Sequence, residues 1–287
     1  MYKGTQEEST VHYVSEPQLD MFNYASKNKL EDNFDIVSKD KEIKFESIGN
    51  STLIGNGNCI DYLKFLKTNT VDLILTDPPY NLGNFMHKRN TNLVKMRENQ
   101  FAYAGWDNLS QEDWEKEMEI FFQESNRVLK KRGALLLFMS LIKIETIVKI
   151  AAKYKFYYKT TGIWHKTNPM PRNMNIHFVN STEAWVYFIN DGTSGTFNND
   201  GKMAHDFIET SLTSSKEKKF GKHPTQKPTK VISHFVKHLS NENDVVLDPF
   251  MGSGTTGVCA RKMNRKFIGI DLDKKYYEIS KSRMLNE

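Results

Sequence analysis

The chain has 287 residues, of which 38% are hydrophobic and 26% charged, and its mean hydropathy is −0.59. No stretch approaches the ~18 to 20 uninterrupted apolar residues of a membrane-spanning helix, so a membrane partner is not expected. Only two cysteines are present, 200 positions apart, which excludes a cysteine-based zinc site. We therefore expect a metal-free protein in a reducing cytoplasm.

The net charge of +5 is unevenly distributed along the chain. Residues 1–50 hold six lysines and ten acids, so the remaining residues carry +9. A basic surplus of this size suits a phosphate-backbone partner, although proteins without one reach it too. Residues 1–50 also lack a sustained apolar period, which predicts a disordered acidic tail.

From about residue 51, short apolar runs alternate with amphipathic stretches, the pattern of βαβ units. Strands are predicted at residues 71–76, 134–139, 184–189, 245–247 and 267–270. Helices are predicted at residues 111–130, 143–154, 230–239 and 275–285. The fold class is therefore α/β, a doubly wound, mostly parallel, Rossmann-like sheet within one domain of residues 51–287.

Two polar stretches interrupt this alternation. Residues 84–108 are basic, with HKRNTNLVKMREN at their centre, and residues 190–223 are rich in Gly, Ser, Thr, Asn and Lys. Loops of this length inside a compact domain are usually functional or disordered. We expect them to be inserted loops rather than parts of the sheet.

The tetrapeptide DPPY follows the first apolar strand directly, from Asp77 to Tyr80. The carboxyl end of a strand is where ligands bind in open α/β sheets. Pro78 and Pro79 fix the backbone and cannot donate hydrogen bonds, so their carbonyls and Asp77 form an edge made only of acceptors. Such an edge suits the exocyclic amine of a nucleobase, and Tyr80 offers a ring on which an extruded base can stack.

A second loop, DPFMGSGTT, follows the strand at residues 245–247. Gly252 and Gly254 permit a tight turn, and the helix that follows presents amides able to bind a carboxylate. Asp271 ends the next strand 17 residues after Gly254, about where a ribose-binding carboxylate lies in nucleoside-binding units. A dehydrogenase could use such a loop, but it would not account for DPPY.

Together the two motifs resemble the amino-DNA methyltransferases of the β arrangement, in which DPPY precedes the cofactor loop. The HPTQKP segment at residues 223–228 and the NCID segment at residues 58–61 are similar to family segments too. Residues 164–172 (WHKTNPMPR) resemble the restriction-modification enzymes that methylate adenine. The family often has an acid where this chain has Asn58, which leaves the adenine contact in that segment open.

The resemblance implies S-adenosyl-L-methionine as cofactor and roles for the matching residues. The catalytic pocket would consist of Asp77, Pro78, Pro79 and Tyr80. The cofactor would be held by Cys59, Ile60, Asp77, His223, Lys227, Pro228, Asp248, Phe250, Gly252, Gly254, Thr255, Thr256 and Asp271.

The expected partner is DNA, with the target base flipped or single-stranded, because a paired base cannot reach such a pocket. The domain would comprise a catalytic half at residues 51–160, a target-recognition segment at 161–222 and a cofactor half at 223–285. Expected phosphate contacts are Lys88, Arg89, Lys166, Arg172, Lys219 and Lys222. A homodimer is left open.

The expected reaction is methylation of adenine N6. The alternative is cytosine N4, whose enzymes tend to have Ser in place of Asp77. Cytosine C5 methylation needs a cysteine nucleophile, and neither Cys59 nor Cys259 lies in a Pro-Cys setting. In the tail, residues 18–22 (QLDMF) resemble the peptide with which bacterial replication and repair proteins bind the sliding clamp. Packing of Met21 and Phe22 onto the domain, or chance, is the alternative interpretation.

Overall fold

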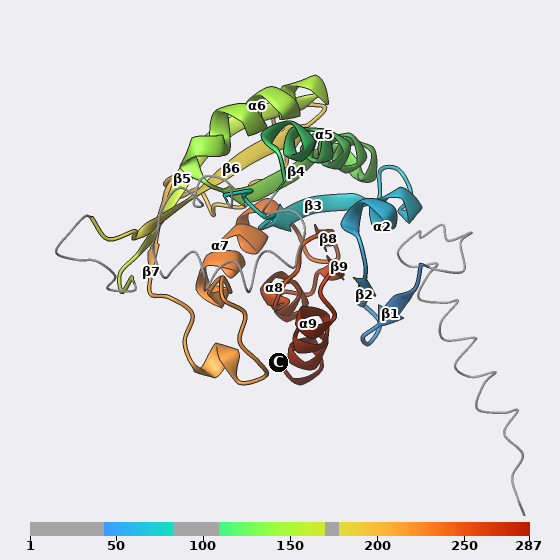
Figure 1. Ribbon diagram of the computed structural model, residues 1–287, viewed down its shortest axis with the longest axis vertical. Helices are drawn as coiled ribbons and strands as arrows, with labels where there is room; N and C mark the ends of the chain where they lie inside the picture. The colour runs from blue at the N-terminus through green and yellow to red at the C-terminus, as the bar shows by residue number, and fades with distance from the viewer. Residues whose placement is uncertain (1–42, 83–108, 170–177) are drawn as a thin grey trace, which may run out of the picture.

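The computed structural model describes residues 43–82, 109–169 and 178–287, which form one nine-stranded sheet with helices on both faces (Figure 1). The strand order is β1-β2-β9-β8-β3-β4-β6-β5-β7. The strands are β1 (Phe45–Ser47), β2 (Thr52–Asn56), β3 (Val71–Thr76), β4 (Leu129–Met139), β5 (Phe156–Lys166), β6 (Thr182–Asn190), β7 (Phe207–Thr210), β8 (Val245–Asp248) and β9 (Lys266–Asp271). The helices are α2 (Cys59–Phe65), α5 (Gln111–Val128), α6 (Ile144–Lys153), α7 (Thr229–Leu239), α8 (Thr255–Lys262) and α9 (Lys274–Asn286), with short 3-10 turns at Leu141–Lys143 and Lys216–Lys218.

Two hydrophobic layers enclose the sheet. Helices α2, α5 and α6 cover one face, while α7, α8 and α9 cover the other (Figure 1). Successive side chains of β3 alternate between the layers, since Ile74 packs in the first, whereas Leu73 and Leu75 pack in the second. Burial on both faces explains why the centre of this strand, residues 73–75, is an unbroken apolar run in the sequence.

Helix α5 shows how local sequence sets these elements. Its first turn is capped by Ser110, whose side chain accepts a hydrogen bond from the amide of Asp113. Trp114, Met118 and Phe121 then recur at helical spacing, and all three are fully buried against the sheet. No helix in the three described ranges is long and apolar enough to cross a membrane.

The two loops predicted to carry the chemistry emerge side by side. Strands β3 and β8 are parallel neighbours, with Leu73 opposite Val246 and Ile74 opposite Leu247. The chain leads from β3 to β4 on one side, and from β8 through α8 to β9 on the other. Ligands of open α/β sheets bind at such a reversal, beyond the carboxyl ends of the strands.

The predicted doubly wound, mostly parallel sheet is confirmed, since five of the eight strand pairings are parallel. All the predicted strands and helices are present, with ends shifted by a few residues or, for β4, extended by five. Two predictions of irregular structure were wrong in part. The stretch 190–223 contains β7, which pairs with β5 at the sheet edge.

The predicted tail also ends earlier than residue 50. Residues 45–47 form β1, which pairs antiparallel with β2. Phe45 packs edge-on against Tyr62, at 4.9 Å between ring centroids, and Tyr277 donates a 2.7 Å hydrogen bond to Glu46. These partners are distant in sequence, so the polar composition of the segment gave no sign of them.

Candidate active site

Asp77 lies immediately after β3 and has partners on both carboxylate oxygens. The Tyr80 hydroxyl donates to Oδ1 at 2.6 Å, and the Lys227 ammonium donates to Oδ2. Pro78 is buried behind them, and Tyr80 packs where the two hydrophobic layers approach this loop. The structure thus places the DPPY residues in one rigid cluster at the carboxyl edge of the sheet.

Lys227 comes from the HPTQKP segment, 150 positions away in sequence. Its side chain is 6% exposed, and its ammonium also lies 3.1 Å from Oε2 of Glu183. Although burial opposes it, the two carboxylates raise the pKa of Lys227 above its ordinary value, so the group is charged. Burial raises the pKa of Asp77, whereas Lys227 acts against that rise.

The sequence analysis did not identify Glu183. It is the second residue of β6, an antiparallel strand, so its amino end lies at the same edge as the carboxyl ends of β3 and β4. Its other oxygen pairs with Lys166 at 2.6 Å. A charged residue at the start of an otherwise apolar strand was the available signal.

The last residue of β8, Asp248, is a second carboxylate at this edge and is held by neutral donors. Its Oδ1 accepts from the Thr76 hydroxyl at 2.8 Å and from the Phe250 amide at 3.2 Å. Burial raises its pKa to about 6. Asp248 therefore joins the ends of β3 and β8 and fixes the start of the glycine loop.

The two glycines predicted to admit a ligand both require a glycine backbone. Gly252 has φ +51° and Gly254, the N-cap of α8, has φ +73°. A Cβ on Gly252 would lie 3.3 Å from the His223 ring, and one on Gly254 would lie 2.8 Å from Cβ of Ser280. A side chain at either position would thus press against its neighbours, so this turn accommodates only backbone atoms.

Asp271, at the end of β9, faces the same turn. It accepts from the amide of Gly252 at 2.7 Å and from the amide of Asp273 at 2.8 Å, and burial raises its pKa to about 7. His223 packs edge-on against Tyr276, with 4.2 Å between ring centroids, and burial lowers its pKa to about 4. An acidic acceptor, a neutral ring and a helix N-terminus therefore converge beside the Asp77 cluster.

Comparison with known proteins agrees with this geometry. The family model for DNA methylase, N6_N4_Mtase, matches residues 71–282. The Type II methyltransferase M2.LlaDCHI of Lactococcus lactis subsp. cremoris is 33% identical over 82% of this chain and 89% of its own length. The Type II methyltransferase M2.DpnII of Streptococcus pneumoniae is 32% identical over 82% of this chain and 90% of its own.

The chain belongs to this DNA methylase family. It is a DNA methyltransferase, and the methyl donor of the family is S-adenosylmethionine. Among solved structures, the M1.HpyAVI–SAM complex has a TM-score of 0.59 and 26% identity, covering 81% of this chain and 99% of that one. The cytosine-N4-specific PvuII DNA methyltransferase has a TM-score of 0.66, with 83% and 87% covered, but at 18% identity it shows the fold alone.

The residues of this DNA methylase suit that cofactor. The turn at Gly252 presents backbone without a side chain, so that a ligand can approach it closely, and Asp271 supplies an acceptor for hydroxyl groups. The N-terminus of α8, at Thr255 and Thr256, can receive a carboxylate. These features stand beside Asp77, so a methyl donor held there would lie close to a base in the DPPY pocket.

The NCID segment, where a cofactor contact was predicted, forms the start of α2. Asn58 caps α2 by accepting from the Ile60 amide at 2.8 Å, a task an acid could also perform. The side chains of Cys59 and Ile60 are buried in the core, only 4% and 5% exposed. Any cofactor contact here would therefore come from the backbone or from the edge of the helix.

The cysteines do not suit covalent catalysis. Cys59 and Cys259 are both buried, and burial raises the pKa of each thiol, to about 11 for Cys259. A thiolate nucleophile is disfavoured at both positions. This supports the expectation that methylation of cytosine C5 is not the reaction.

The basic residues expected at DNA lie in different settings. Lys88, Arg89 and Arg172 fall outside the described residues, while Lys219 and Lys222 are exposed just before the HPTQKP segment. Lys166 does not fit the expectation, because its side chain is 12% exposed and pairs with Glu183.

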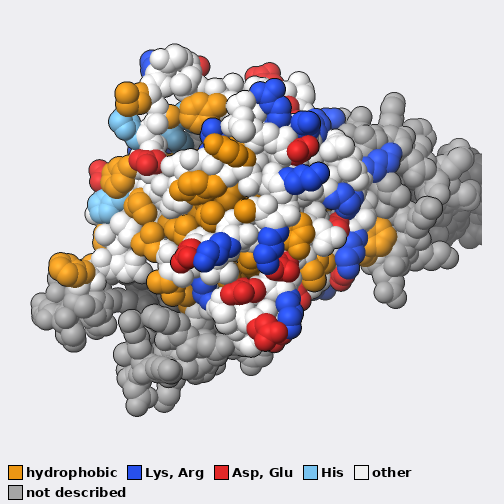
Figure 2. Space-filling model, turned by 90° about the horizontal axis from the view of Figure 1, so that it is seen from above, with side chains coloured by type: hydrophobic (Ala, Val, Ile, Leu, Met, Phe, Trp, Pro, Cys, Tyr) orange, Lys and Arg blue, Asp and Glu red, His pale blue; other side chains and the backbone are white. Residues whose placement is uncertain are grey.

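The face seen in Figure 2 shows no continuous basic field. Lysines and arginines are interspersed there with acids and with a group of hydrophobic side chains. Along α5 and α6, which lie on the upper side of the molecule in Figure 1, lysines pair with glutamates. The pairs are Lys116–Glu112, Lys149–Glu145 and Lys153–Glu119. These two helices hold seven acids and four bases, so the basic surplus of the chain does not lie on them.

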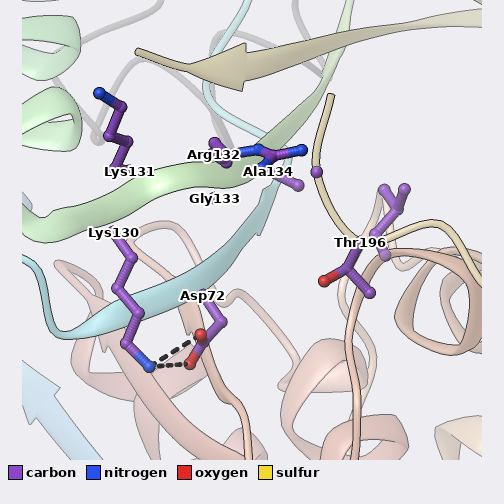
Figure 3. Close-up of a pocket in the computed structure, with 9 residues that line it drawn as sticks. Asp72, Lys130, Lys131, Arg132, Gly133, Ala134 and Thr196 are labelled. Atoms are coloured by element: carbon purple, nitrogen blue, oxygen red, sulfur yellow. Dashed lines mark hydrogen bonds and ion pairs between the residues drawn. The ribbon is translucent and has the colours of Figure 1, made fainter. Parts of the chain in front are cut away.

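A pocket lies at the opposite, amino-terminal end of β3 and β4 (Figure 3). Lys130 there binds both oxygens of Asp72, at 2.8 and 2.9 Å, and Arg132 binds the carbonyl and hydroxyl of Ser194. Both cations are engaged within the protein, and the DPPY loop leaves β3 at its other end. This pocket is therefore separate from the methylation site.

Proposed function

We propose that this DNA methyltransferase methylates N6 of adenine. The observation that carries the proposal is the acidic side chain of Asp77 at the head of the Pro-Pro-Tyr loop, in ionic contact with Lys227. Cytosine-N4 enzymes of the family tend to have Ser at that position. A carboxylate is a stronger acceptor than a hydroxyl, so it suits an amine whose lone pair must be localised for attack.

In the proposed mechanism, the residues of the chain bind and orient the base and the cofactor, and they stabilise the charge that develops on the amine. When bound, S-adenosylmethionine supplies a methyl group activated by its sulfonium. Asp77 Oδ1, which also accepts from the neutral Tyr80 hydroxyl, accepts a hydrogen bond from the adenine amine, because the charged Lys227 occupies Oδ2. The backbone carbonyl at Pro78 is the second acceptor in this edge, and the Tyr80 ring stacks on the base.

Alignment is the main source of catalysis here. The amine nitrogen forms a bond to the methyl carbon, the carbon–sulfur bond breaks, and the nitrogen then loses a proton. Holding two reactants in line can lower a barrier by up to about 7 to 11 kcal/mol in model reactions. The prolines and the Asp77–Lys227 contact make the base side of that alignment rigid.

The cofactor side of the proposed site consists of the glycine loop and its neighbours. Asp271 would hold the ribose hydroxyls, and Gly252, Gly254, Thr255 and Thr256 the methionine part. His223, Pro228, Asp248 and Phe250 would shape the pocket. For DNA, Lys219 and Lys222 are the exposed cations of the described residues that we assign to phosphate contact.

The relatives named Type II methyltransferases support a restriction-modification role, in which methylation protects a short recognition sequence. Incubation of the protein with methyl-labelled cofactor and DNA, followed by digestion and nucleoside analysis, tests the proposal. N6-methyladenine is the expected product. Detection of N4-methylcytosine alone would support the alternative reaction.

We also propose that residues 18–22 can bind a sliding clamp, which would bring the enzyme to newly copied DNA. The support is the sequence QLDMF itself, since this segment lies outside the described residues. A labelled peptide of residues 16–24 should bind purified clamp in fluorescence anisotropy. Absence of binding at about 100 micromolar would remove the proposal.

A further inference from the structure

A line of alternating charges leads away from the catalytic loop. Asp77 contacts Lys227, Lys227 lies 3.1 Å from Glu183, and Glu183 lies 2.6 Å from Lys166. The four side chains come from the end of β3, the segment before α7, the start of β6 and the end of β5. Neither Glu183 nor its contact with Lys227 has a role in the mechanism given above.

Lys227 contacts both carboxylates of this line, and its own charge is almost completely buried. The ammonium also lies 4.8 Å from the centre of the Phe138 ring, so little water can reach it. A buried ammonium is stable only when its donors are satisfied, and it has three of them. Asp77 Oδ2 takes one donor, and Glu183 supplies the second carboxylate.

Without the charge of Glu183, Asp77 would be the only anion of the described residues in contact with Lys227. The ammonium would then be drawn toward Oδ1 as well, the oxygen that now accepts only from Tyr80. That is the oxygen left for a base amine. Competition at Oδ1 would weaken the acceptor edge and rotate the Asp77 carboxylate.

We propose that Glu183 is a positioning residue for methyl transfer, which holds Lys227 away from Oδ1 of Asp77 so that this oxygen can receive the target amine. The inference rests on the proposed role of Asp77 as amine acceptor. It gives a role in the reaction to the start of β6, an antiparallel strand that otherwise only extends the sheet.

A purely structural role for Glu183 makes a different prediction. Glu183 and Trp164 are paired residues of β6 and β5, and the Lys166 contact joins the same two strands. If Glu183 only joined these strands, removal of Lys166 would cost as much as removal of the Glu183 charge. If Glu183 acts through Lys227, the two changes differ.

The pH profile provides a second distinction. Asp77 is faced by Tyr80 of its own loop, by Lys227, by Glu183 and by Asp248 of β8, with Lys166 and His223 one contact further away. Burial and the negative charge of Glu183 raise the pKa of Asp77. Loss of that charge lowers it, so an acidic limb due to Asp77 should move to lower pH.

The experiment compares four full-length variants with the unmodified enzyme. Glu183→Gln keeps the shape and removes the charge, Glu183→Asp keeps the charge, and Lys166→Met removes the outer partner. Glu119→Gln is the matched control, because Glu119 pairs with Lys153 on the outer helices at 2.6 Å. Methyl transfer to DNA, cofactor KM, the Tm and the methylated nucleoside are measured for each, the rates from pH 5.5 to 8.5.

Glu183→Gln should lower kcat about 10- to 100-fold, the loss typical of removing the support of a reacting group, with cofactor KM changed by less than about threefold. Its acidic limb should move to lower pH. Glu183→Asp should recover part of the rate, and Lys166→Met should lose less than about threefold. Glu119→Gln should match the unmodified enzyme.

The proposal fails if Glu183→Gln turns over at the rate of the unmodified enzyme. It also fails if kcat falls only in step with the Tm and equally in Lys166→Met, with no movement of the limb. If Glu183→Gln does not fold, Glu183→Asp is the test, because its shorter side chain draws the carboxylate away from the 3.1 Å contact with Lys227: a reduced kcat at unchanged KM would support the proposal, and an unchanged kcat would contradict it. The nucleoside formed tests adenine N6 separately, since an N4-methylcytosine product leaves the rate ratios intact.

Discussion

The two loops that meet at the β3–β8 reversal are built on opposite principles. The catalytic loop is defined by side chains, because Asp77 has an ionic partner in Lys227 and a neutral one in Tyr80. The cofactor loop is defined by backbone, since Gly252 and Gly254 hold left-handed conformations that other residues rarely adopt. Substitutions that remove a charge should therefore impair the first loop, and substitutions that add side-chain volume should impair the second.

The carboxylates of the two loops differ in the same way. Asp77 faces a cation, whereas Asp248 and Asp271 accept hydrogen bonds from hydroxyl and amide donors. Burial raises the pKa of Asp248 to about 6 and that of Asp271 to about 7. Asp77, the proposed amine acceptor, thus has a cation that opposes the effect of burial on its pKa, whereas Asp248 and Asp271 have only neutral donors.

Removal of the Asp77 carboxylate should have the largest effect on turnover. Asp77→Ala should lower kcat by about 10² to 10³-fold or more, the scale of losing one preorganised hydrogen-bonding group at a reacting centre. Cofactor affinity, measured by calorimetry, should change little. The fold should persist because Lys227 keeps Glu183 as a counter-charge.

The matched control for this change is Asp200→Ala. Asp200 also pairs with a lysine, Lys237 at 2.9 Å, but the pair is exposed and far from the loop in sequence. It should leave turnover unchanged. Turnover of Asp77→Ala above a small fraction of the unmodified rate would remove the assigned role.

A volume change in the cofactor loop should act on affinity instead. Gly252→Val places a branched side chain at φ +51° and against the His223 ring. If the turn moves out of its binding position to relieve this contact and the left-handed strain, about 1 to 3 kcal/mol, cofactor binding should weaken roughly 5- to 150-fold, with a smaller change in kcat at saturation. Calorimetry and the dependence of rate on cofactor concentration separate the two.

Gly201 offers a control for backbone strain alone. It has φ +71°, yet nothing lies within 4 Å of the position a Cβ would take. Gly201→Val should therefore strain the backbone without blocking a ligand, and cofactor affinity should be retained. If both variants bound the cofactor as the unmodified enzyme does, the assignment of this turn would be wrong.

How far the sequence predicted these loops depends on how local their determinants are. The apolar run of β3 and the motif after it lie within ten residues, so strand, edge and candidate residues could be predicted together. The same holds for β8 and the glycines. Neighbouring placement of the loops required the parallel pairing of β3 with β8, which the structure shows.

Two residues that support the loops, Glu183 and Arg283, were not predicted, because their partners are distant in sequence. Glu183 is recognisable only once β6 is known to run antiparallel beside β4. Arg283 is fully buried, and its guanidinium donates to the Ser253 carbonyl and the Thr255 hydroxyl, each at 2.9 Å. In the sequence it is one of several charges on a C-terminal helix.

Cofactor affinity should depend moderately on pH, because Asp271 changes its protonation near neutral pH. Its raised pKa means that the carboxyl is neutral below about pH 7 and ionised above it. An ionised carboxylate is the better acceptor for hydroxyl groups, so affinity should rise from pH 6 to pH 8, by up to about tenfold. His223, whose pKa is about 4, is neutral throughout this range.

Asp271→Asn should bind the cofactor more weakly and remove most of that rise, as measured by calorimetry at pH 6, 7 and 8. Asp248, whose pKa is about 6, would contribute only at the lower end. A rise of the same size in Asp271→Asn would assign the pH dependence to another group.

The smallest effect is expected for the hydroxyl of Tyr80, a side chain in which the two principles meet. Its ring is proposed to stack on the base, while its hydroxyl donates to Asp77 Oδ1 at 2.6 Å. Tyr80→Phe removes the hydroxyl only, and because that bond occupies the oxygen needed by the amine, its loss should change kcat by less than about threefold. Tyr80→Ala also removes the ring, and a stacking contact of about 1 to 3 kcal/mol predicts a loss of roughly 5- to 150-fold. Single-turnover methyl transfer to one DNA duplex compares the pair. Equal losses in the two variants would mean that the hydroxyl, rather than the ring, is what the site requires.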